Sequence, residues 1–514
     1  MHHNILTDLN RTAREKPDKP AFSDGVNGLT FRELHCACRG VGTFLHRRGI
    51  YRQPVVIFME KSPQEVAAFL GTVAGGCFYV PIDAEMPGGR IQMILDNVKS
   101  PMMICDAHTL ETARSFRLDG TEAVLYSDIA KTEPDDRALA EIYDKAIDTD
   151  PVYIVFTSGS TGIPKGVAAC HRSVLDYVEQ LSETLGFNEN TVFGNQTPLY
   201  FDACLKEVYS TIRYGATTYL IPKNLFSIPV ALVEYLNEHQ INTICWVVSA
   251  LTMISAFGTF DVVKPKYLKT VAFGSEVFPV RQLTLWQKAL PGASFTNLYG
   301  PTEGTGMCCY YHVNRAFQEG ESIPIGRPFP NRDILLLTKD NRPAEAGEEG
   351  EICIRGTSLT LGYYNDPERT AAAFVQNPLQ SAFPELIYKT GDIGRYNEAG
   401  ELLFVSRKDY QIKHMGHRVE LGEIEVNVSM LPGVGMAACI YDENRGKIVL
   451  YYVGNMAEVE LLSALKRKLP RYMLPNRLTR LERLPQTANG KIDRVALKRM
   501  YLESAAHKNG SRNR

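Results

Sequence analysis

The decapeptide Thr-Ser-Gly-Ser-Thr-Gly-Ile-Pro-Lys-Gly at residues 157–166 has the composition of a loop that binds phosphate groups. It follows the apolar run 152–156, which predicts a strand that ends where the loop begins. Small residues leave backbone N–H groups open to an anion, the hydroxyls add donors, and Lys165 adds a positive charge. This combination suits a polyanion such as the triphosphate of ATP. A flexible surface turn is the alternative interpretation.

The spacing of this loop differs from that of a P-loop. Counted from Gly159, Pro164 stands where the second glycine of that motif belongs. Lys165 is followed by Gly166, whereas a P-loop has a serine or threonine there to ligate magnesium. These two differences argue against a P-loop kinase or GTPase.

Composition indicates the kind of protein that must position the loop. The 514 residues carry a net charge of −2, and no run of about 18 apolar residues occurs. A nucleic-acid surface, a polybasic membrane patch and membrane insertion are therefore not expected. The N-terminus lacks the shape of a signal peptide, and the 11 cysteines include no C-x-x-C pair. We expect a soluble cytoplasmic protein with free, buried thiols.

The order of predicted elements indicates an α/β fold. Short apolar runs alternate with segments of helix length over residues 55–82 and again over 191–280. This alternation predicts α/β layers with largely parallel sheets, and the glycine-punctuated strand pattern of 345–364 indicates a β subdomain. We expect a large N-terminal domain over 1–408, a small mobile α+β C-terminal domain over 409–504 and a disordered tail over 505–514.

Nine further motifs extend the pattern over nearly the whole chain. In order they are LTFREL (29–34), FYVPIDAEMP (78–87), YFDA (200–203), NLYGPTEGT (297–305), GEICIRG (350–356), YKTGD (388–392), SRKDYQIKHMGHRVELGEIE (406–425), PRYMLP (470–475) and NGKIDR (489–494). With the loop, they resemble the AMP-forming adenylating enzymes, which include acyl-CoA synthetases, luciferases and nonribosomal peptide adenylation domains. The chain is most similar to amino-acid-activating domains and to D-alanine–carrier protein ligases.

The resemblance implies ATP and Mg²⁺ as cofactors. A carboxylate that attacks the α-phosphorus of ATP meets another anion, so the site must neutralise charge and hold the groups in line. By resemblance, Lys491 bridges the substrate carboxylate and the α-phosphate, Thr302 approaches that phosphate, and Glu303 ligates magnesium. Tyr299 stacks on adenine, Asp392 binds the ribose hydroxyls, and Arg407 makes a second contact there. The other implied nucleotide-binding residues are Thr157, Ser158, Gly159, Ser160, Thr161, Lys165, Gly274 and Asn297.

Each of the three central assignments has a structural alternative. Glu303 could be a carboxylate stabilised at a helix N-terminus. Asp392 could be a turn aspartate, and Lys491 an exposed turn lysine. The motifs around these residues favour the functional interpretation.

Asp409 matches the hinge between the two domains of the family. One orientation of the small domain brings Lys491 to the nucleotide, and a rotation then presents residues 410–425 and a tunnel for a thiol. The family usually has glycine before Arg407, and this sequence has Ser406.

Asp202 indicates which acid is activated. In the amino-acid activators, the aspartate of the FDA segment pairs with the substrate ammonium, and a capping aspartate is the alternative. Lys206 either points inward to pair with a glutamate-, aspartate- or glutamine-like side chain, or lies on a helix face with its ammonium in solvent. The positions that line the side-chain pocket by resemblance are Ala203, Lys206, Cys245, Val271, Phe273, Leu298, Gly306 and Met307.

The acceptor of the activated group is expected on another protein. No L-G-G-x-S phosphopantetheine motif follows NGKIDR, and no H-H-x-x-x-D-G segment precedes Leu29. We therefore expect a free-standing amino acid–carrier protein ligase acting on a separate phosphopantetheinylated carrier protein. An acyl- or aryl-CoA synthetase and a non-catalytic adenylate-binding scaffold are the alternatives.

Overall fold

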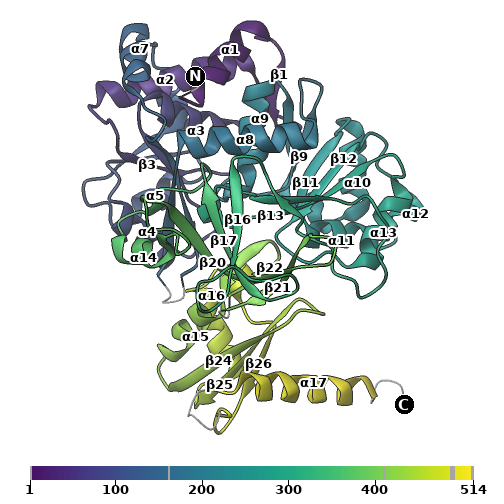
Figure 1. Ribbon diagram of the computed structural model, residues 1–514. Helices are drawn as coiled ribbons and strands as arrows, with labels where there is room; N and C mark the ends of the chain where they lie inside the picture. Colours follow the sequence, from purple (N-terminus) through teal and green to yellow (C-terminus); the bar gives the residue numbers. More distant parts are fainter. Residues whose placement is uncertain (1–2, 160–162, 409–410, 487–491, 511–514) are drawn as a thin grey trace. The chain divides into compact units, whose positions relative to one another are not determined.

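The computed structural model describes residues 3–159, 163–408, 411–486 and 492–510 (Figure 1). Contacts divide the chain into two compact units. The first comprises Met1–Ala84, Leu95–Phe156 and Gly166–Lys408, and the second comprises Glu85–Ile94, Thr157–Lys165 and Asp409–Arg514. The phosphate loop thus groups with the second unit, whereas the boundaries expected from the sequence assign it to the large domain. The predicted α/β class, with a large and a small part, is confirmed.

A seven-stranded sheet holds the strand that leads into the phosphate loop. Its order is β18-β8-β7-β4-β3-β5-β6, with β3 to β7 joined by parallel pairings. The loop joins β7 to β8, its neighbour in the sheet. The strand bounds are β3 (Pro54–Phe58), β4 (Phe78–Pro81), β5 (Met102–Cys105), β6 (Glu122–Leu125), β7 (Pro151–Thr157), β8 (Lys165–Cys170) and β18 (Gly362–Tyr363).

Two helices near this sheet pack closely because small residues face each other. Helix α2 (Phe31–Arg47) begins at a capping box formed by Thr30 and Glu33. It packs on α3 (Pro63–Ala74), where a Cβ added to Gly71 would lie 2.6 Å from the Val41 Cβ. The other helices of this half are α1 (Leu6–Glu15), α4 (Gly88–Val98), α5 (Leu110–Arg114), α6 (Tyr126–Ile129), α7 (Asp136–Lys145) and α8 (His171–Leu185).

A nine-stranded sheet carries four of the eight predicted pocket residues, Cys245, Val271, Phe273 and Leu298. Its order is β15-β14-β13-β12-β11-β9-β10-β1-β2, and the strands from β13 to β1 run parallel. The strand bounds are β1 (Pro20–Ser23), β2 (Gly28–Thr30), β9 (Val192–Asn195), β10 (Thr217–Leu220), β11 (Thr243–Val247), β12 (Thr270–Gly274), β13 (Ser294–Tyr299), β14 (Cys309–His312) and β15 (Arg327–Pro328).

Helices gather around strands β11 and β12 of this sheet (Figure 1). Apolar residues of both strands form one core cluster with residues of α10, α11 and α13, and Trp286 is fully buried there. The helices of this half are α9 (Leu205–Tyr214), α10 (Pro229–Glu238), α11 (Val248–Ala256), α12 (Thr259–Val262) and α13 (Val280–Ala289), with 3₁₀ turns at Asp202–Cys204, Lys223–Ser227 and Thr302–Gly304.

The predicted β subdomain is a five-stranded antiparallel sheet. Strands β16, β17, β20 and β19 follow one another, and β21 pairs with β20. This pairing sets Asp392 opposite Arg407. The bounds are β16 (Arg332–Leu337), β17 (Gly350–Gly356), α14 (Pro367–Ala373), β19 (Phe374–Gln376), β20 (Leu386–Tyr396) and β21 (Leu402–Arg407).

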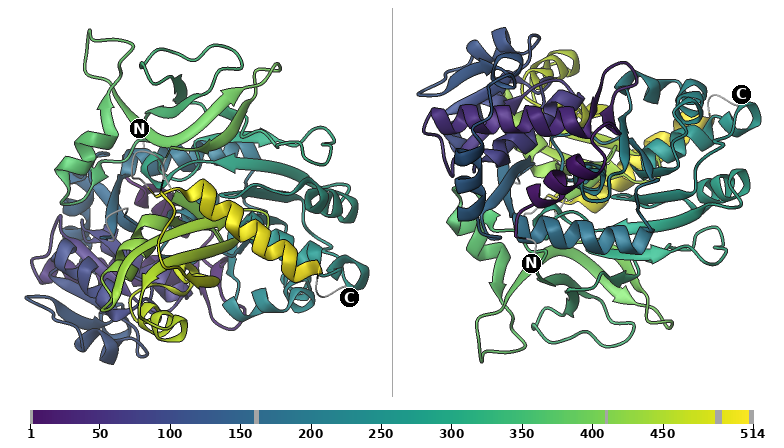
Figure 2. Two further views of the ribbon diagram at one scale, coloured as in Figure 1. Left: turned by 90° about the horizontal axis from the view of Figure 1, so that it is seen from below. Right: turned by 90° about the horizontal axis from the view of Figure 1, so that it is seen from above.

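The second unit is built on a three-stranded sheet buried on both faces. Residues alternate along β24 and β25, so that Ala437 and Cys439 face helices α15 and α16 while Ala438 and Ile440 face α17. Figure 2 shows α17 lying along the sheet. The bounds are β22 (Gln411–His414), β23 (His417–Glu420), α15 (Leu421–Ser429), β24 (Val434–Asp442), β25 (Lys447–Gly454), α16 (Glu458–Lys466), a 3₁₀ turn (Arg471–Met473), β26 (Arg477–Arg480) and α17 (Arg494–Gly510).

Helix α17 extends from Arg494 to Gly510. The disorder expected for the tail over 505–514 stays a prediction. Residues 511–514 lie outside the described part. Among the described residues, no helix has both the length and the apolar character that a bilayer crossing requires.

Candidate active site

The predicted site residues of the first unit gather at one edge of the nine-stranded sheet. Strand β12 ends at Gly274 and β13 ends at Tyr299, and the register pairs Gly274 with Val247 on one side and Leu298 on the other. Asp202 follows the neighbouring strand β9 after a short loop. Because these strands are parallel, their carboxyl ends share an edge, which is where α/β sheets bind ligands.

The residues implied in nucleotide binding form one hydrogen-bonded group. The Tyr299 hydroxyl donates to Asp392 Oδ2, and the Arg407 guanidinium pairs with Asp392 Oδ1. Arg407 also donates to the carbonyl of Thr390 at 3.1 Å, and Thr390 Oγ1 accepts from the Asp392 backbone N–H at 2.9 Å. The Asp392 side chain is almost fully buried. The geometry therefore holds an oriented carboxylate beside an aromatic ring, as ribose and adenine recognition requires.

The predicted magnesium ligand is a buried carboxylate held by a tyrosine. Glu303 is fully buried, and Tyr363 donates its hydroxyl to Oε1 at 2.7 Å. Among the described residues, no group of three or more His, Cys, Asp or Glu forms a metal-binding cluster. Magnesium in nucleotide sites commonly takes one or two carboxylates and completes its shell with phosphates and water. A single hard oxygen donor such as Glu303 fits that pattern.

Asp202 lies next to the residues that would meet the α-phosphate. Thr302 hydrogen-bonds to its carboxylate, and Lys206 and Glu303 lie near enough to act on it electrostatically. Desolvation raises the pKa of Asp202, and the Thr302 hydrogen bond and the Lys206 charge partly oppose that rise. A carboxylate in this state gains from a cationic ligand.

A small cavity brings together most of the predicted pocket residues. Its volume is about 10 Å³. The predicted residues that line it are Ala203, Lys206, Cys245, Phe273, Gly274, Leu298 and Met307, and Thr197, Trp246, Val247, Ala272 and Ser275 complete it.

The chain matches two family descriptions. The description "AMP-binding enzyme" matches residues 9–364, and "AMP-binding enzyme C-terminal domain" matches residues 423–491. The chain belongs to the AMP-binding enzyme family. The resemblance of its motifs to AMP-forming adenylating enzymes is thereby confirmed.

The relatives of this AMP-binding enzyme include synthetases of peptides. It is 30% identical to delta-poly-L-ornithine synthetase of Acinetobacter baumannii (strain AB307-0294) over 99% of this chain and 38% of that protein. It is also 30% identical to tyrocidine synthase 1 of Brevibacillus parabrevis over 94% of this chain and 43% of that protein. The chain thus spans less than half the length of these relatives.

Solved structures share the fold. Holo-PA1221, a nonribosomal peptide synthetase protein containing adenylation and PCP domains, aligns with a TM-score of 0.83 and 26% identity over 97% of this chain and 84% of that one. An o-succinylbenzoate CoA synthetase from Bacillus subtilis aligns with a TM-score of 0.82 and 20% identity over 97% and 98% of the two chains, which shows the fold alone. This AMP-binding enzyme is therefore an adenylating enzyme similar to nonribosomal peptide synthetase adenylation domains.

Lys206 of this AMP-binding enzyme does not extend into solvent. Its side chain is 4% exposed, Nζ donates to the Ala203 carbonyl at 2.5 Å, and Glu207 Oε1 lies 3.9 Å away. The alternative of a solvent-exposed ammonium is therefore wrong. The helix face that carries Lys206 packs into the protein, so the ammonium finds its partners inside.

Three predicted residues lie beside the cavity without lining it. Val271 is fully buried in the apolar cluster that includes Trp286, and Gly306 approaches the Tyr177 ring so closely that an added Cβ would lie 2.7 Å from Tyr177 Cζ. Asn297 is buried and donates its side-chain amide to the Pro324 carbonyl at 2.9 Å. The geometry gives Asn297 a supporting role.

Trp246 is the largest of the five lining residues that the sequence interpretation missed. It directly follows Cys245 on β11, and its Nε1 donates to the Gly194 carbonyl at 2.7 Å. The chain has only two tryptophans, so its position beside a predicted pocket residue was the available signal.

Part of the predicted phosphate site lies in the second unit. Ser158 Oγ donates to the Arg418 carbonyl at 2.7 Å, and Glu423, which pairs with Arg90, accepts a backbone hydrogen bond from Gly159. The Thr157 hydroxyl is buried and has no hydrogen-bond partner among the residues that the structure describes. Lys165 begins β8. The predicted residues Ser160, Thr161, Asp409 and Lys491 lie outside the described residues.

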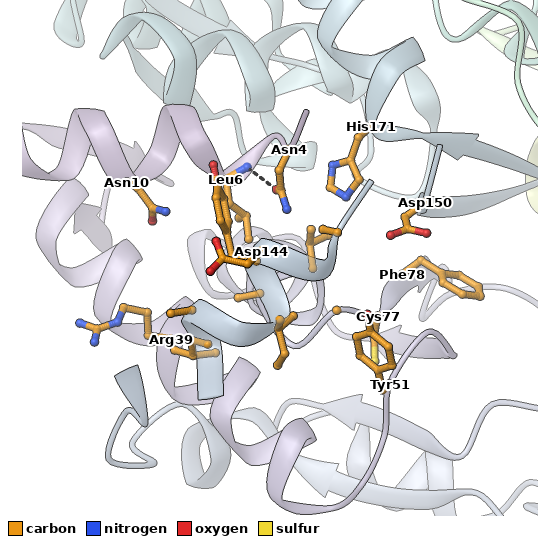
Figure 3. A pocket seen from close by; sticks show the side chains of 18 of the residues that line it. Asn4, Leu6, Asn10, Arg39, Tyr51, Cys77, Phe78, Asp144, Asp150 and His171 are labelled. Carbon is orange, nitrogen blue, oxygen red and sulfur yellow. Dashed lines mark hydrogen bonds between the residues drawn. The ribbon is translucent and has the colours of Figure 1, made fainter. Parts of the chain in front are cut away.

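A larger cavity lies near the N-terminus of this AMP-binding enzyme (Figure 3). Its volume is about 330 Å³, and residues of α1, α2 and α7 contribute to its wall. Two ion pairs lie on the wall, Arg39 with Asp136 and Arg52 with Asp150. None of the predicted site residues is among those that line it.

Proposed function

We propose that this chain activates an amino acid as its adenylate and then passes the aminoacyl group to the pantetheine thiol of a carrier protein. In the first step a carboxylate oxygen of the amino acid attacks the α-phosphorus of ATP. The bond between the α-phosphorus and the bridging oxygen breaks, and pyrophosphate leaves with that electron pair. In the second step the thiolate attacks the carbonyl carbon, and AMP leaves as the thioester forms.

The observation that carries the proposal is the position of Asp202. Its carboxylate accepts hydrogen bonds from the Thr302 side chain and the Ala203 backbone and lies within electrostatic reach of Lys206, and Ala203 and Lys206 line the small cavity. A substrate ammonium at Asp202 would place the substrate carboxylate toward Thr302 and the side chain toward the cavity. An acid without an α-amine leaves this carboxylate without a cationic ligand, which is costly in a desolvated site.

The remaining residues have assigned parts in the same reaction. Asp392 and Arg407 would position the ribose, and Tyr299 would contact the adenine. Glu303 would hold the magnesium ion, which neutralises phosphate charge as pyrophosphate leaves. Lys165 and the loop 157–161 would hold the β- and γ-phosphates, and Lys491 would stabilise the charge that develops on the α-phosphate and substrate carboxylate.

A carrier protein is the proposed acceptor because relatives combine the two modules. Holo-PA1221, at 26% identity, is a protein containing both adenylation and PCP domains. A pantetheine thiol on such a domain is the proposed nucleophile of the second step. Since the matched portion covers only part of the curated relatives, the carrier can lie on a separate protein or on the same polypeptide, and we favour a separate one.

The test is ATP–pyrophosphate exchange with a panel of L- and D-amino acids and, in parallel, fatty and aryl acids. Exchange that depends on one or a few amino acids is the expected result. We expect Asp202→Ala and Lys491→Ala to lower it by at least tenfold, while the surface variant Asp261→Ala leaves it unchanged. Exchange only with acids that lack an α-amine would instead identify an acyl- or aryl-CoA synthetase. Exchange with no acid at all would indicate a non-catalytic adenylate-binding scaffold.

A further inference from the structure

We infer that the amino acid taken by this site has a side chain no larger than a methyl group and without charge, which means glycine or alanine. This inference rests on the proposed function and narrows it to a substrate class. It also replaces the glutamate-, aspartate- or glutamine-like substrate that an inward-pointing Lys206 suggests from the sequence.

The volume of the cavity sets the first limit. The space enclosed by Ala203, Cys245, Phe273, Leu298 and the residues beside them is about 10 Å³. A cavity needs roughly 10–15 Å³ by this measure to hold one water molecule. A methyl group has about the size of a water molecule, whereas the branched side chain of leucine or the ring of phenylalanine is several times larger. The cavity therefore admits a hydrogen atom or a methyl group.

The large side chains around the cavity are held in place. Trp246 is 2% exposed and its indole N–H is fixed to the Gly194 carbonyl. Phe273 is 1% exposed and packs edge-on against Phe278, with ring centroids 4.8 Å apart. Met307 is the third bulky residue, and it is 7% exposed. Close-packed side chains with fixed partners do not withdraw for a larger substrate without cost.

The floor of the cavity is closed by backbone. Gly274 lines it at the end of β12, and a Cβ added there would lie only 2.4 Å from the Leu298 carbonyl oxygen. The two strands are therefore in contact at this point, and the cavity does not continue between them. A longer substrate side chain finds no deeper channel in this direction.

The charge on Lys206 is already balanced inside the protein. Its Nζ donates to the Ala203 carbonyl at 2.5 Å and lies 3.9 Å from Glu207 Oε1. Glu207 is fully buried, and Asn195 Nδ2 lies 3.5 Å from its other oxygen. A carboxylate on the substrate side chain would compete with Glu207 and add a second negative charge beside this buried pair. The arrangement therefore favours an uncharged side chain.

The experiment compares exchange rates of the purified full chain with glycine, both enantiomers of alanine, valine, leucine, phenylalanine, aspartate and glutamate at equal concentrations. We expect glycine or alanine to support exchange at least tenfold faster than any of the larger or charged amino acids, since one methylene group in a tight pocket changes the rate by about tenfold or more. Fastest exchange with leucine, phenylalanine, aspartate or glutamate would overturn the inference.

Enlarging the cavity should change this preference. Met307→Ala removes the most exposed of the three bulky residues, and we expect it to raise the rate with valine or leucine relative to alanine by at least tenfold. Met102→Ala is the matched control, because Met102 is equally large, 1% exposed and located on β5 of the other sheet. Phe273→Leu is a milder second enlargement. Unchanged preference in folded Met307→Ala and Phe273→Leu would contradict the role of the cavity.

The outcomes separate the inference from the proposed function. Rapid exchange with a large amino acid would overturn the substrate class and leave amino acid activation standing. Exchange with fatty or aryl acids alone, or with no acid, would overturn the proposed function and the inference with it. Exchange with glycine or alanine supports both.

Discussion

Residues 202–207 bring three ionisable side chains beside the candidate substrate cavity. Lys206 and Glu207 are buried and lie 3.9 Å apart, and Asp202 is partly buried against Thr302. Each charge loses hydration there, and only the lysine and glutamate compensate each other directly. Lys206 lines the cavity with its charge opposed by Glu207, and in the proposed function Asp202 would bind the cationic group of the substrate.

Glu207 gives a pH-dependent contribution to stability that can be measured. Burial raises its pKa from an ordinary value near 4.5 to about 7, against the opposing charge of Lys206. Between these values the folded state holds a proton that the unfolded state has released, so stability falls as pH rises through 7. Between pH 5 and pH 8 we expect the free energy of unfolding of the wild type to fall by about 3 kcal/mol relative to that of Glu207→Gln, because each pKa unit is worth about 1.4 kcal/mol.

Thermal midpoints of both proteins at several pH values between 5 and 8 would measure this effect. The matched control is Glu234→Gln on α10, where the carboxyl group is exposed. We expect the difference between wild type and Glu207→Gln to grow with pH and the difference for the control to stay constant. A constant difference for Glu207→Gln would show that this carboxyl group titrates normally.

At the scale of elements, the candidate site depends on how closely β12 and β13 approach each other. Both strands are parallel and in register from Thr270 to Gly274, and both end at the candidate site. The absence of a side chain at Gly274 lets the Leu298 carbonyl lie against the backbone there. The strands thus align Tyr299 with the wall of the substrate cavity.

Gly274→Ala tests this close approach. The added Cβ would lie 2.4 Å from the Leu298 carbonyl oxygen, so the strands must separate. We expect the free energy of unfolding to fall by about 1–3 kcal/mol, which is typical of overpacking. We also expect a lower rate of amino-acid-dependent ATP–pyrophosphate exchange. Gly292→Ala is the control, since nothing lies within 4 Å of a Cβ added there. Equal thermal midpoints for the two variants would refute the steric argument.

The predicted elements were largely correct where pattern and packing agree. The strand expected over 152–156 lies within β7, and the strand pattern expected over 345–364 includes β17. The alternation of apolar residues along β24 and β25 does not reveal that both faces are covered, because α17 arrives from a distant part of the chain. Only packing identifies such an element as part of the core.

At the scale of the whole molecule, the residues named in the proposed function belong to two units. Asp202, Glu303, Tyr299 and Asp392 belong to the first unit, and the phosphate loop belongs to the second. The proposed hinge, Asp409, is the first residue of the segment of the second unit that follows Lys408.

Asp409→Pro is expected to affect the two half-reactions unequally. Proline fixes one backbone dihedral, and a hinge must absorb a change in backbone dihedrals. We expect Asp409→Pro to lower the rates of both half-reactions, amino-acid-dependent pyrophosphate exchange and transfer to a carrier thiol. The fold decrease in one rate should exceed the fold decrease in the other by at least tenfold. Asp409→Ala, which removes the same side chain without fixing the backbone, is the control. Equal losses in both half-reactions for Asp409→Pro would place the hinge elsewhere.

The sequence by itself determined the reaction class, because motifs such as TSGSTGIPKG, YGPTE and YKTGD require particular residue types in a fixed order. It also determined the α/β architecture, because apolar periodicity follows from local geometry. The tertiary structure decided what those motifs could not. It buried Lys206 with its counter-charge, placed Trp246 in the wall of the candidate cavity and buried Val271 in the apolar cluster behind that wall. Cavity size and charge pairing depend on side chains from distant strands, and no local pattern encodes the space left between them.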